Sequence, residues 1–253
     1  MARIISIVNQ KGGVGKTTTA VNLAAYLAQA GQNVLLVDMD PQANATSGLG
    51  IDHQGLSKGI YEVLTGQHRL SQVTIPTKHV GLKVAPATIS LAGAGIELVN
   101  ENEREYKLHQ ALLEGHGGYD YILIDCPPSL GLITINSLTA GQEVLIPVQA
   151  EYYALEGLGQ LLNTINLVRD NLKPDLKVLG AVLTMYDRRN KLSTEVMEQL
   201  YRYFPNRIFR SIIPRTVQLA EAPSYGQSIL HYRPFSKGAR AYERLAREIL
   251  ATE

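Results

Sequence analysis

The sequence has almost no cysteine and no long apolar run. Cys126 is its single cysteine, so the chain can form no internal disulfide and no Cys-x-x-Cys metal knuckle, as is typical of proteins of a reducing cytosol. The apolar stretch at the N-terminus is too short for a signal peptide and runs into a polar glycine loop. No run approaches the ~18 apolar residues of a membrane span. These absences predict a soluble cytoplasmic protein.

A strong net charge is also missing. The formal charge is +1 over 253 residues, which gives no overall reason to expect a nucleic-acid ligand. The distribution is uneven, because residues 1–179 hold 12 Lys+Arg against 16 Asp+Glu, whereas residues 180–253 hold 12 against 7. The basic C-terminal third could attract a polyanion. Scattered solvated charge is the alternative interpretation.

Linkers, internal repeats and metal-ligand spacings are absent as well. Hydrophobic residues make up 45% and charged residues 19% of the chain, a balance typical of a folded globular protein. The six histidines show neither His-x₃-His nor His-Glu-x-x-His spacing, and we assign them no chemistry. We therefore predict one domain over residues 1–253, without zinc.

What is present is an alternation of strands and helices. A β-branched strand at Arg3–Val8 leads through a glycine loop to a helix at Thr17–Ala30, which Gly31 ends. Further apolar runs predict buried strands at Asn33–Val37, Tyr119–Ile124, Glu143–Val148, Lys177–Leu183 and Arg207–Ile213, with helices at Ala154–Arg169 and Ser193–Tyr203. Such alternation predicts an α/β fold with a twisted, mostly parallel sheet and helices on both faces.

Two regions are harder to place. Between residues 50 and 118 we expect small helices at Ser57–Leu64 and Ile89–Asn100 and a strand near Leu82–Ala85, as an excursion between the second and third main strands. The last segment, Ala239–Ala251, has one apolar stripe at helical spacing. We expect that stripe to pack against the core, with membrane attachment as the alternative.

The glycine loop has the form of a phosphate-binding loop. It reads NQKGGVGKTTTA from Asn9 to Ala20 and sits between a strand and a helix, where backbone N–H groups and the helix dipole attract an anion. Its glycines permit close approach, its last lysine can reach the β- and γ-phosphates, and a hydroxyl can serve Mg²⁺. These residues are Gly12, Gly13, Gly15, Lys16 and Thr17. The pattern predicts a P-loop NTPase.

The loop departs from the common G-x-x-x-x-G-K-[ST] pattern. Gln10 stands where its first glycine belongs, and a second lysine, Lys11, follows. Beyond the loop, three aspartates follow predicted strands, where ligands of parallel sheets bind. Asp125 has the context of a metal-holding carboxylate, while of Asp38 and Asp40 we expect one to hold Mg²⁺-bound water and the other to position the attacking water.

At this point the chain resembles the ParA/Soj family of chromosome and plasmid partition ATPases. The resemblance rests on QKGGVGKTTTAVNLA, LLVDMDPQANAT, YDYILIDCPPSLG and IPR…EAPSYGQSI, and it covers essentially the whole chain. The K-G-G-x-G-K-[ST] loop marks the wider deviant-Walker group, which includes MinD-like and nitrogenase-iron-protein-like members. The DPQANAT and EAPS segments are those of the partition branch.

The resemblance implies an ATPase with weak intrinsic activity that uses ATP and Mg²⁺. It implies that Lys11 crosses the interface of an ATP-sandwich homodimer to the partner's phosphates, with Lys11, Lys16 and Asp40 as catalytic residues. It implies metal binding by Thr17, Asp38 and Asp125. The nucleotide would contact Lys11, Gly12, Gly13, Val14, Gly15, Lys16, Thr17 and Thr18, and its base the segments Thr184–Met185 and Pro214–Arg215.

The resemblance also implies partners. The ATP dimer would bind double-stranded DNA without sequence preference, on the nucleoid, and a ParB-type protein would stimulate hydrolysis. Among the basic residues of the C-terminal third, which include Arg188 and Lys191, the expected DNA contacts are Arg189, Arg215, Arg233, Lys237 and Arg240. Gln218 stands where some relatives carry a basic residue. The chain begins at the loop strand, so no N-terminal helix-turn-helix and no specific operator binding are expected.

Other functions of the same group stay open or fail on particular residues. A MinD-like membrane switch would need a terminal helix rich in bulky apolar and basic residues, whereas the chain ends REILATE. An electron-transfer ATPase would need two cysteines per subunit for a shared [4Fe–4S] cluster, and only Cys126 exists. A ParA-like ATPase that positions another cargo is the remaining alternative.

Overall fold

We describe the fold from a computed structural model. It describes residues 2–115, 117–151, 156–187, 189–204 and 207–252. Of the basic residues considered above, Arg188 lies outside these ranges.

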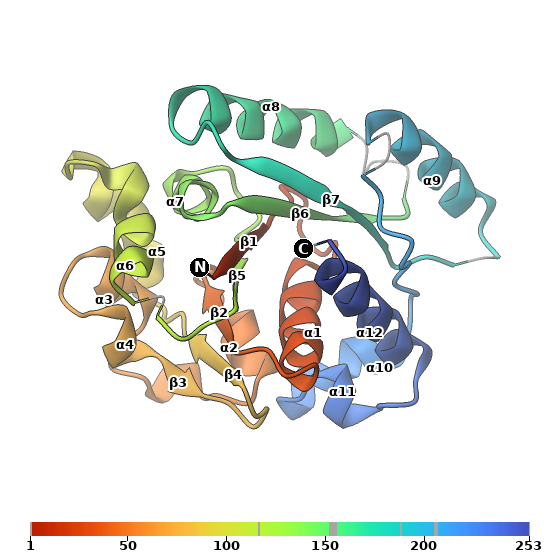
Figure 1. The fold of residues 1–253 in the computed structure, drawn as a ribbon, viewed down its shortest axis with the longest axis horizontal. Coiled ribbons are helices and arrows are strands. Elements are labelled where there is room, and N and C mark those ends of the chain that lie inside the picture. Colours follow the sequence, from red (N-terminus) through yellow and green to blue (C-terminus); the bar gives the residue numbers. More distant parts are fainter. Residues whose placement is uncertain (1, 116, 152–155, 188, 205–206, 253) are drawn as a thin grey trace.

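A seven-stranded sheet forms the centre of the molecule (Figure 1). Its order is β3-β4-β2-β5-β1-β6-β7, and its neighbours run parallel except for β3 and β4. The strands are β1 (Arg3–Ile7), β2 (Val34–Asp38), β3 (Ile75–Pro76), β4 (Leu82–Ala85), β5 (Tyr121–Asp125), β6 (Glu143–Gln149) and β7 (Lys177–Thr184). The neighbouring strands β2 and β5 are buried along their whole length because helices cover both sides.

The helices divide into two layers, each with its own apolar core (Figure 1). One layer contains α1 (Lys16–Gln29), α2 (Asn44–Gly48), α10 (Val217–Glu221), α11 (Ile229–Tyr232) and α12 (Lys237–Leu250). The other contains α3 (Ile60–Leu64), α4 (Leu70–Val73), α5 (Leu91–Glu97), α6 (Lys107–Gly115), α7 (Leu132–Ala140), α8 (Glu156–Asn171) and α9 (Lys191–Tyr203). Short 3₁₀ turns lie at His53–Gly55, Leu98–Asn100, Arg104–Tyr106 and, as η5, Ala222–Tyr225. The predicted α/β class with helices on both faces is confirmed.

The region 50–118 is more closely joined to the sheet than an excursion would be. The predicted strand Leu82–Ala85 is β4, which pairs with β2 and carries the antiparallel edge strand β3. The terminal helix α12 buries its apolar stripe against α1, as expected for a helix of the core. No helix among the described residues is long and apolar enough to cross a membrane.

The predicted strand Arg207–Ile213 is wrong. The segment makes one isolated bridge, Ala181 to Ile208, and returns to β7 only where Ile213 N–H donates to Leu183 O. Between these points the Arg210 N–H donates to the Glu248 carboxylate of α12 at 2.8 Å. In a continuous strand the Ser211 N–H would donate to Leu183 O, because the Phe209 N–H donates to Ala181 O. Ile213 makes that bond instead, so the segment has two residues more than strand pairing allows, which the apolar pattern alone does not show.

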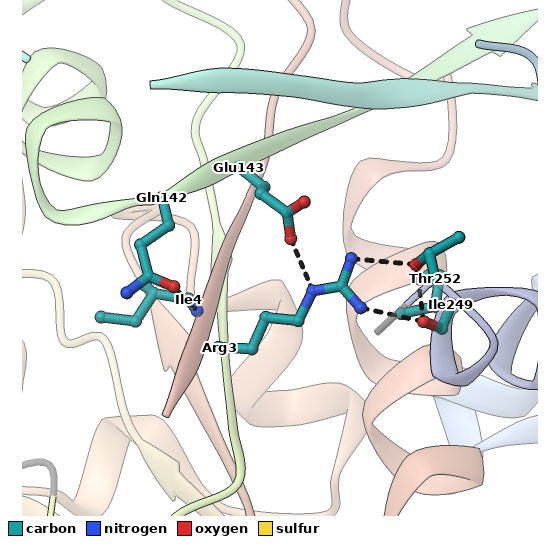
Figure 2. Close-up of polar contacts among 6 residues, drawn as sticks. All are labelled: Arg3, Ile4, Gln142, Glu143, Ile249 and Thr252. Carbon is teal, nitrogen blue, oxygen red and sulfur yellow. Dashed lines mark hydrogen bonds and ion pairs between the residues drawn. The ribbon is translucent and has the colours of Figure 1, made fainter. Parts of the chain in front are cut away.

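Arg3 ties the first strand to the end of the last helix (Figure 2). Its Nε donates to Glu143 of β6 at 2.6 Å, and its two terminal nitrogens donate to Ile249 O and Thr252 Oγ1 at 2.9 and 3.0 Å. The Arg3 and Glu143 side chains are 17% and 20% exposed, so the pair is shielded and its charge-assisted bonds are stronger than those of surface pairs. This contact fixes α12 at the amino end of the sheet, opposite the loop that follows β1.

Candidate functional site

Three neighbouring strands deliver the predicted site residues to one edge of the sheet. In the order β2-β5-β1, Asp38 is paired in register with Asp125, and Asp125 with Ile7. The glycine loop leaves β1 two residues beyond Ile7. Because parallel strands end on the same side, Asp125 lies between the loop and Asp38.

The loop has the backbone conformation that its glycines allow. Gly13 and Gly15 have φ of 74° and 89°, in the left-handed region that side chains disfavour. Gly15 immediately precedes the first residue of α1, so the loop passes directly into a helix N-terminus. From the far side, Thr184 at the end of β7 donates its hydroxyl to Val14 O at 2.7 Å. The loop is thereby held between two strands.

Lys16 is almost fully buried at the start of α1. Its Nζ donates to Lys11 O at 3.1 Å, and 7% of the residue is exposed. Burial lowers the pKa of Lys16, while the nearby carboxylates of Asp125 and Asp40 oppose that shift. A buried ammonium that contacts one backbone carbonyl and lies near two carboxylates can bind phosphate oxygens as a point charge.

Asp125 is fully buried at the end of β5. Its exposed fraction is 0%, and neither carboxylate oxygen accepts a hydrogen bond among the described residues. Burial raises the pKa of Asp125 well above its usual value, and the neighbouring Asp38 raises it further; Thr17 and Lys16 counteract the shift. A buried carboxylate in this condition is costly for the fold, and a cation or its bound water would satisfy it. The Thr17 and Asp125 oxygens therefore fit Mg²⁺.

Asp38 is equally buried, but both of its carboxylate oxygens accept hydrogen bonds. One of its oxygens accepts from the Thr46 N–H at 2.8 Å and the Thr46 hydroxyl at 2.7 Å, and the other accepts from the Asp40 N–H at 3.2 Å. Burial raises the pKa of Asp38 to about 6, while the Thr46 bonds act in the opposite direction. These contacts give Asp38 a second possible task, which is to fix the turn that carries Asp40.

Asp40 follows on that turn and lines the cavity beside the loop. Its Oδ1 accepts from the Gln42 N–H at 3.0 Å, and 7% of the residue is exposed. The turn then passes through Ala43, which has a φ of 53°. A non-glycine residue in the left-handed region is strained, and such strain concentrates at functional sites.

Lys11 lies at the mouth of the loop. Its N–H donates to Asn9 Oδ1 at 3.0 Å, and its Nζ lies 3.6 Å from the Glu151 carboxylate. The Lys11 side chain is 34% exposed. Sequence reasoning missed Glu151, because nothing in the pattern after β6 marks one carboxylate as a neighbour of the loop.

The loop borders a cavity of about 610 Å³. Gly12, Gly13, Gly15, Lys16, Thr17, Thr18, Asp40 and Met185 all line it. So do Ala222, Pro223, Ser224 and Gln227 of the EAPSYGQ segment and Gln42, Asn44 and Ser47 beside α2. The sequence singled out EAPS and DPQANAT only for the resemblance they carry, yet both segments form walls of this cavity.

The two segments predicted to flank the base are adjacent but line different cavities. Met185 lines the loop cavity and has a φ of 51°, whereas Pro214 and Arg215 line a second cavity of about 840 Å³. Hydrogen bonds from Tyr186 N–H to Ile213 O and from Arg215 N–H to Tyr186 O place the two segments side by side. Base contact by Pro214 and Arg215 stays a prediction.

The second cavity gathers positive charge. Its cationic residues are Arg189, Arg210, Arg215, Lys237, Arg240 and Arg244. Four of them belong to the predicted DNA contacts, while Arg210 and Arg244 were not among them. The fifth predicted contact, Arg233, lies instead over the Tyr232 ring, 5.4 Å from its centre, and does not line this cavity. Asp187 pairs with Arg189 at 2.8 Å in the same cavity.

Comparison with known proteins gives consistent relatives over nearly the full chain. The AAA domain family model matches residues 2–178. The chain is 53% identical to the sporulation initiation inhibitor protein Soj of Bacillus subtilis over 251 residues, which are 99% of each chain. It is 52% identical to the chromosome partitioning protein ParA of Myxococcus xanthus, covering 99% of this chain and 88% of that one.

Solved structures share the fold. A cobyrinic acid a,c-diamide synthase of Mycobacterium smegmatis, with bound ADP and magnesium, has a TM-score of 0.88 and 40% identity, covering 99% of this chain and 94% of its own. A plasmid partition protein of Borrelia burgdorferi bound to AMPPNP has a TM-score of 0.86 and 27% identity, with both chains fully covered.

Proposed function

Since the chain belongs to the ParA/Soj family of chromosome-partitioning ATPases, we propose that it is an ATP-driven switch for DNA segregation. It is an ATPase whose cofactors are ATP and Mg²⁺. In the proposed cycle, ATP binding forms a sandwich homodimer that binds DNA without sequence preference. Slow hydrolysis, stimulated by a ParB-type partner, then releases the DNA.

The orphaned carboxylate of Asp125 is the observation that carries the nucleotide half of this proposal. It lies beside a glycine loop, a buried lysine and a cavity of about 610 Å³. Bound Mg²⁺ would neutralise the phosphate charge there. Thr17 and Asp125 would hold the metal, directly or through water. Metal binding by Asp38 stays a proposal because both of its oxygens already accept hydrogen bonds.

The remaining residues have distinct proposed tasks. Lys16 and the loop N–H groups bind the phosphates, and Asp40 orients the attacking water from its turn. Met185 lines the same cavity beside the loop. Lys11 reaches the phosphates bound by the partner protomer, where a cation supplied in trans contributes ~10³–10⁵ to the rate in the cases measured.

The basic cavity supports the DNA half. Arg189, Arg215, Lys237 and Arg240 share one cavity, and a dimer would present two of them. Contacts from Lys and Arg to phosphates are independent of sequence and weaken steeply with salt. Tyr186 lines the basic cavity and directly follows Met185, which lines the nucleotide cavity, so nucleotide state could alter the shape of the basic cavity.

Two other functions, a membrane-associated switch and the positioning of another cargo, are less well supported. The apolar stripe of α12 is buried against α1, which leaves it unavailable to a membrane surface. Positioning of another cargo stays open, although the relatives near 50% identity are chromosome-partitioning proteins.

DNA retention tests the proposed switch. The protein is passed over immobilised double-stranded DNA with ATP, ADP or no nucleotide, across a salt series. We expect binding only with ATP and a steep loss with rising salt. Equal retention in every nucleotide state would remove the switch.

Light scattering tests the trans role of Lys11. The wild type should form a dimer with the non-hydrolysable analogue AMPPNP, while Lys11→Ala should stay monomeric because each protomer loses its contact with the partner's phosphates. A normal nucleotide-dependent dimer of Lys11→Ala would contradict the assignment.

A further inference from the structure

Glu151 joins the loop of the nucleotide cavity to the basic cavity. It lies two residues beyond the end of β6. Its carboxylate is 3.6 Å from Lys11 Nζ and 2.9 Å from Arg215 Nη2, and it also accepts from Gln149 Nε2 at 2.7 Å. One side chain thus holds a cation from each of the two sites.

The contact constrains only the side chain of Lys11. The Lys11 backbone is fixed independently, because its N–H donates to Asn9 Oδ1 and its C=O accepts from Lys16 Nζ. The stem of Lys11 can therefore rotate between Glu151 and another anion while the loop stays in place. In the monomer described here the ammonium is directed toward its own protomer's Glu151.

The ion pair between Lys11 and Glu151 is weak enough to break when another anion binds Lys11. The Lys11 and Glu151 side chains are 34% and 43% exposed, and exposed ion pairs of this kind are weak. A triphosphate carries several negative charges, so it competes effectively with one carboxylate for the same ammonium. Arg215 would remain with Glu151 after Lys11 departs, since that pair is shorter.

We propose that Glu151 is a positioning residue that holds Lys11 inside its own protomer until a second, nucleotide-loaded protomer takes the ammonium over. This proposal rests on the trans role of Lys11 stated above. Each protomer must break one such pair when the dimer forms, so Glu151 raises the nucleotide and protein concentrations at which the dimer appears.

Glu151→Gln removes the charge and keeps the shape. Release of a weak exposed ion pair changes the dissociation constant of the dimer by up to about fivefold per protomer. Because two protomers contribute, the dissociation constant of the AMPPNP dimer should fall by up to about 25-fold. Sedimentation equilibrium measures this constant. Glu114→Gln is the matched control, since Glu114 is an exposed carboxylate on α6 that forms no ion pair among the described residues.

A second readout follows Lys11 itself in the nucleotide-free monomer. Acylation of Lys11 Nζ, measured by mass spectrometry of its peptide, should be faster in Glu151→Gln by up to about fivefold, because the ammonium is no longer held in a pair. A residue that only supports the fold would not change this rate selectively. Lysines far from the contact, such as Lys58, serve as internal standards.

The outcomes separate the two proposals. If Lys11→Ala still forms the AMPPNP dimer, the trans role fails and the Glu151 proposal fails with it. If Lys11→Ala stays monomeric but Glu151→Gln dimerises like the wild type, the trans role stands and the restraint is overturned. Faster acylation with an unchanged dimer constant would also overturn it, because the pair would then have no effect on assembly.

Discussion

At the scale of single residues, Asp38 and Asp125 occupy equivalent strand ends but have opposite surroundings. Both are 0% exposed and lie in register on β2 and β5. Asp38 accepts three hydrogen bonds, whereas Asp125 accepts none among the described residues. A satisfied buried carboxylate stabilises a fold, and an unsatisfied one opposes it. The same residue type at the same register therefore has different consequences for stability.

This difference predicts opposite effects of an isosteric substitution. Asp125→Asn should stabilise the protein free of nucleotide and Mg²⁺ by about 1 kcal/mol, because it removes a buried carboxylate whose desolvation cost Lys16 and Thr17 offset only in part. Asp38→Asn should destabilise it by about 1–3 kcal/mol, because the amide nitrogen cannot accept the bonds that one oxygen accepts now. Urea denaturation at pH 7 measures both. Destabilisation by both variants to the same extent would show that Asp125 has a partner in solution.

The two other charged residues of the cavity should separate binding from hydrolysis. Lys16→Ala should abolish nucleotide binding, since it removes the buried cation beside the phosphates. Asp40→Ala should retain ATP and leave the dimer trapped, because the turn no longer positions the attacking water. Equilibrium binding of a fluorescent ATP analogue and phosphate release distinguish the two. Normal hydrolysis by Asp40→Ala would refute the assignment of the water.

At the scale of elements, the fold depends on contacts between segments remote in the sequence. His79, in the turn between β3 and β4, stacks on His231 of α11, with ring centres 3.9 Å apart. This turn also brings Gly81 against Gln32 O at the end of the loop after α1. The stack therefore attaches the sheet edge to the layer that contains α1 and α12.

The stack predicts a loss of stability in mild acid. Burial lowers the pKa of His79 to about 4, and the His231 ring lowers it as well. An unfolded histidine titrates near ~6.5, so this site's contribution is fully present above that pH and is lost as the pH falls toward about 4. His79→Phe keeps a ring that cannot be protonated.

The measurement is the free energy of unfolding of wild type and His79→Phe between pH 7 and pH 4. The wild type should lose stability more steeply than the variant across this range. Equal slopes would mean that the His79 ring is not held neutral by the fold.

At the scale of the whole molecule, the basic cavity assembles residues that no single segment contains. Arg189 and Arg215 come from loops after β7, while Lys237 and Arg240 lie on α12. Arg233 is near Lys237 in the sequence but contacts the Tyr232 ring instead. If the cavity is where DNA binds, position in the fold rather than sequence neighbourhood determines which cations contribute.

Arg240→Gln and Arg233→Gln form a matched pair for that prediction. Arg240→Gln should weaken ATP-dependent DNA retention and reduce the salt slope by about two units, since one phosphate contact is lost from each of the two protomers of the dimer. Arg233→Gln should have a smaller effect. Binding isotherms at several salt concentrations measure both, and equal losses would place the DNA over a wider surface than the cavity.

The sequence by itself determined the site's chemical components and the alternation of strands and helices along the chain. Glycines, Lys16 and Thr17 are contiguous, and strands ending in aspartate have a local signature, so the phosphate loop and the α/β class are readable from short segments. The strand Leu82–Ala85 was also predicted with its observed bounds.

Only the tertiary structure decided how those components divide their tasks. It showed that Asp38 accepts hydrogen bonds from Thr46, whereas neither Asp125 oxygen accepts one among the described residues. It also showed that Glu151 contacts Lys11 and that two additional residues interrupt the predicted strand Arg207–Ile213. Each of these depends on a partner remote along the chain or on the local path of the backbone. Hydrophobic periodicity indicates which side of a helix or strand is buried. It carries no information about which polar group a given side chain will contact.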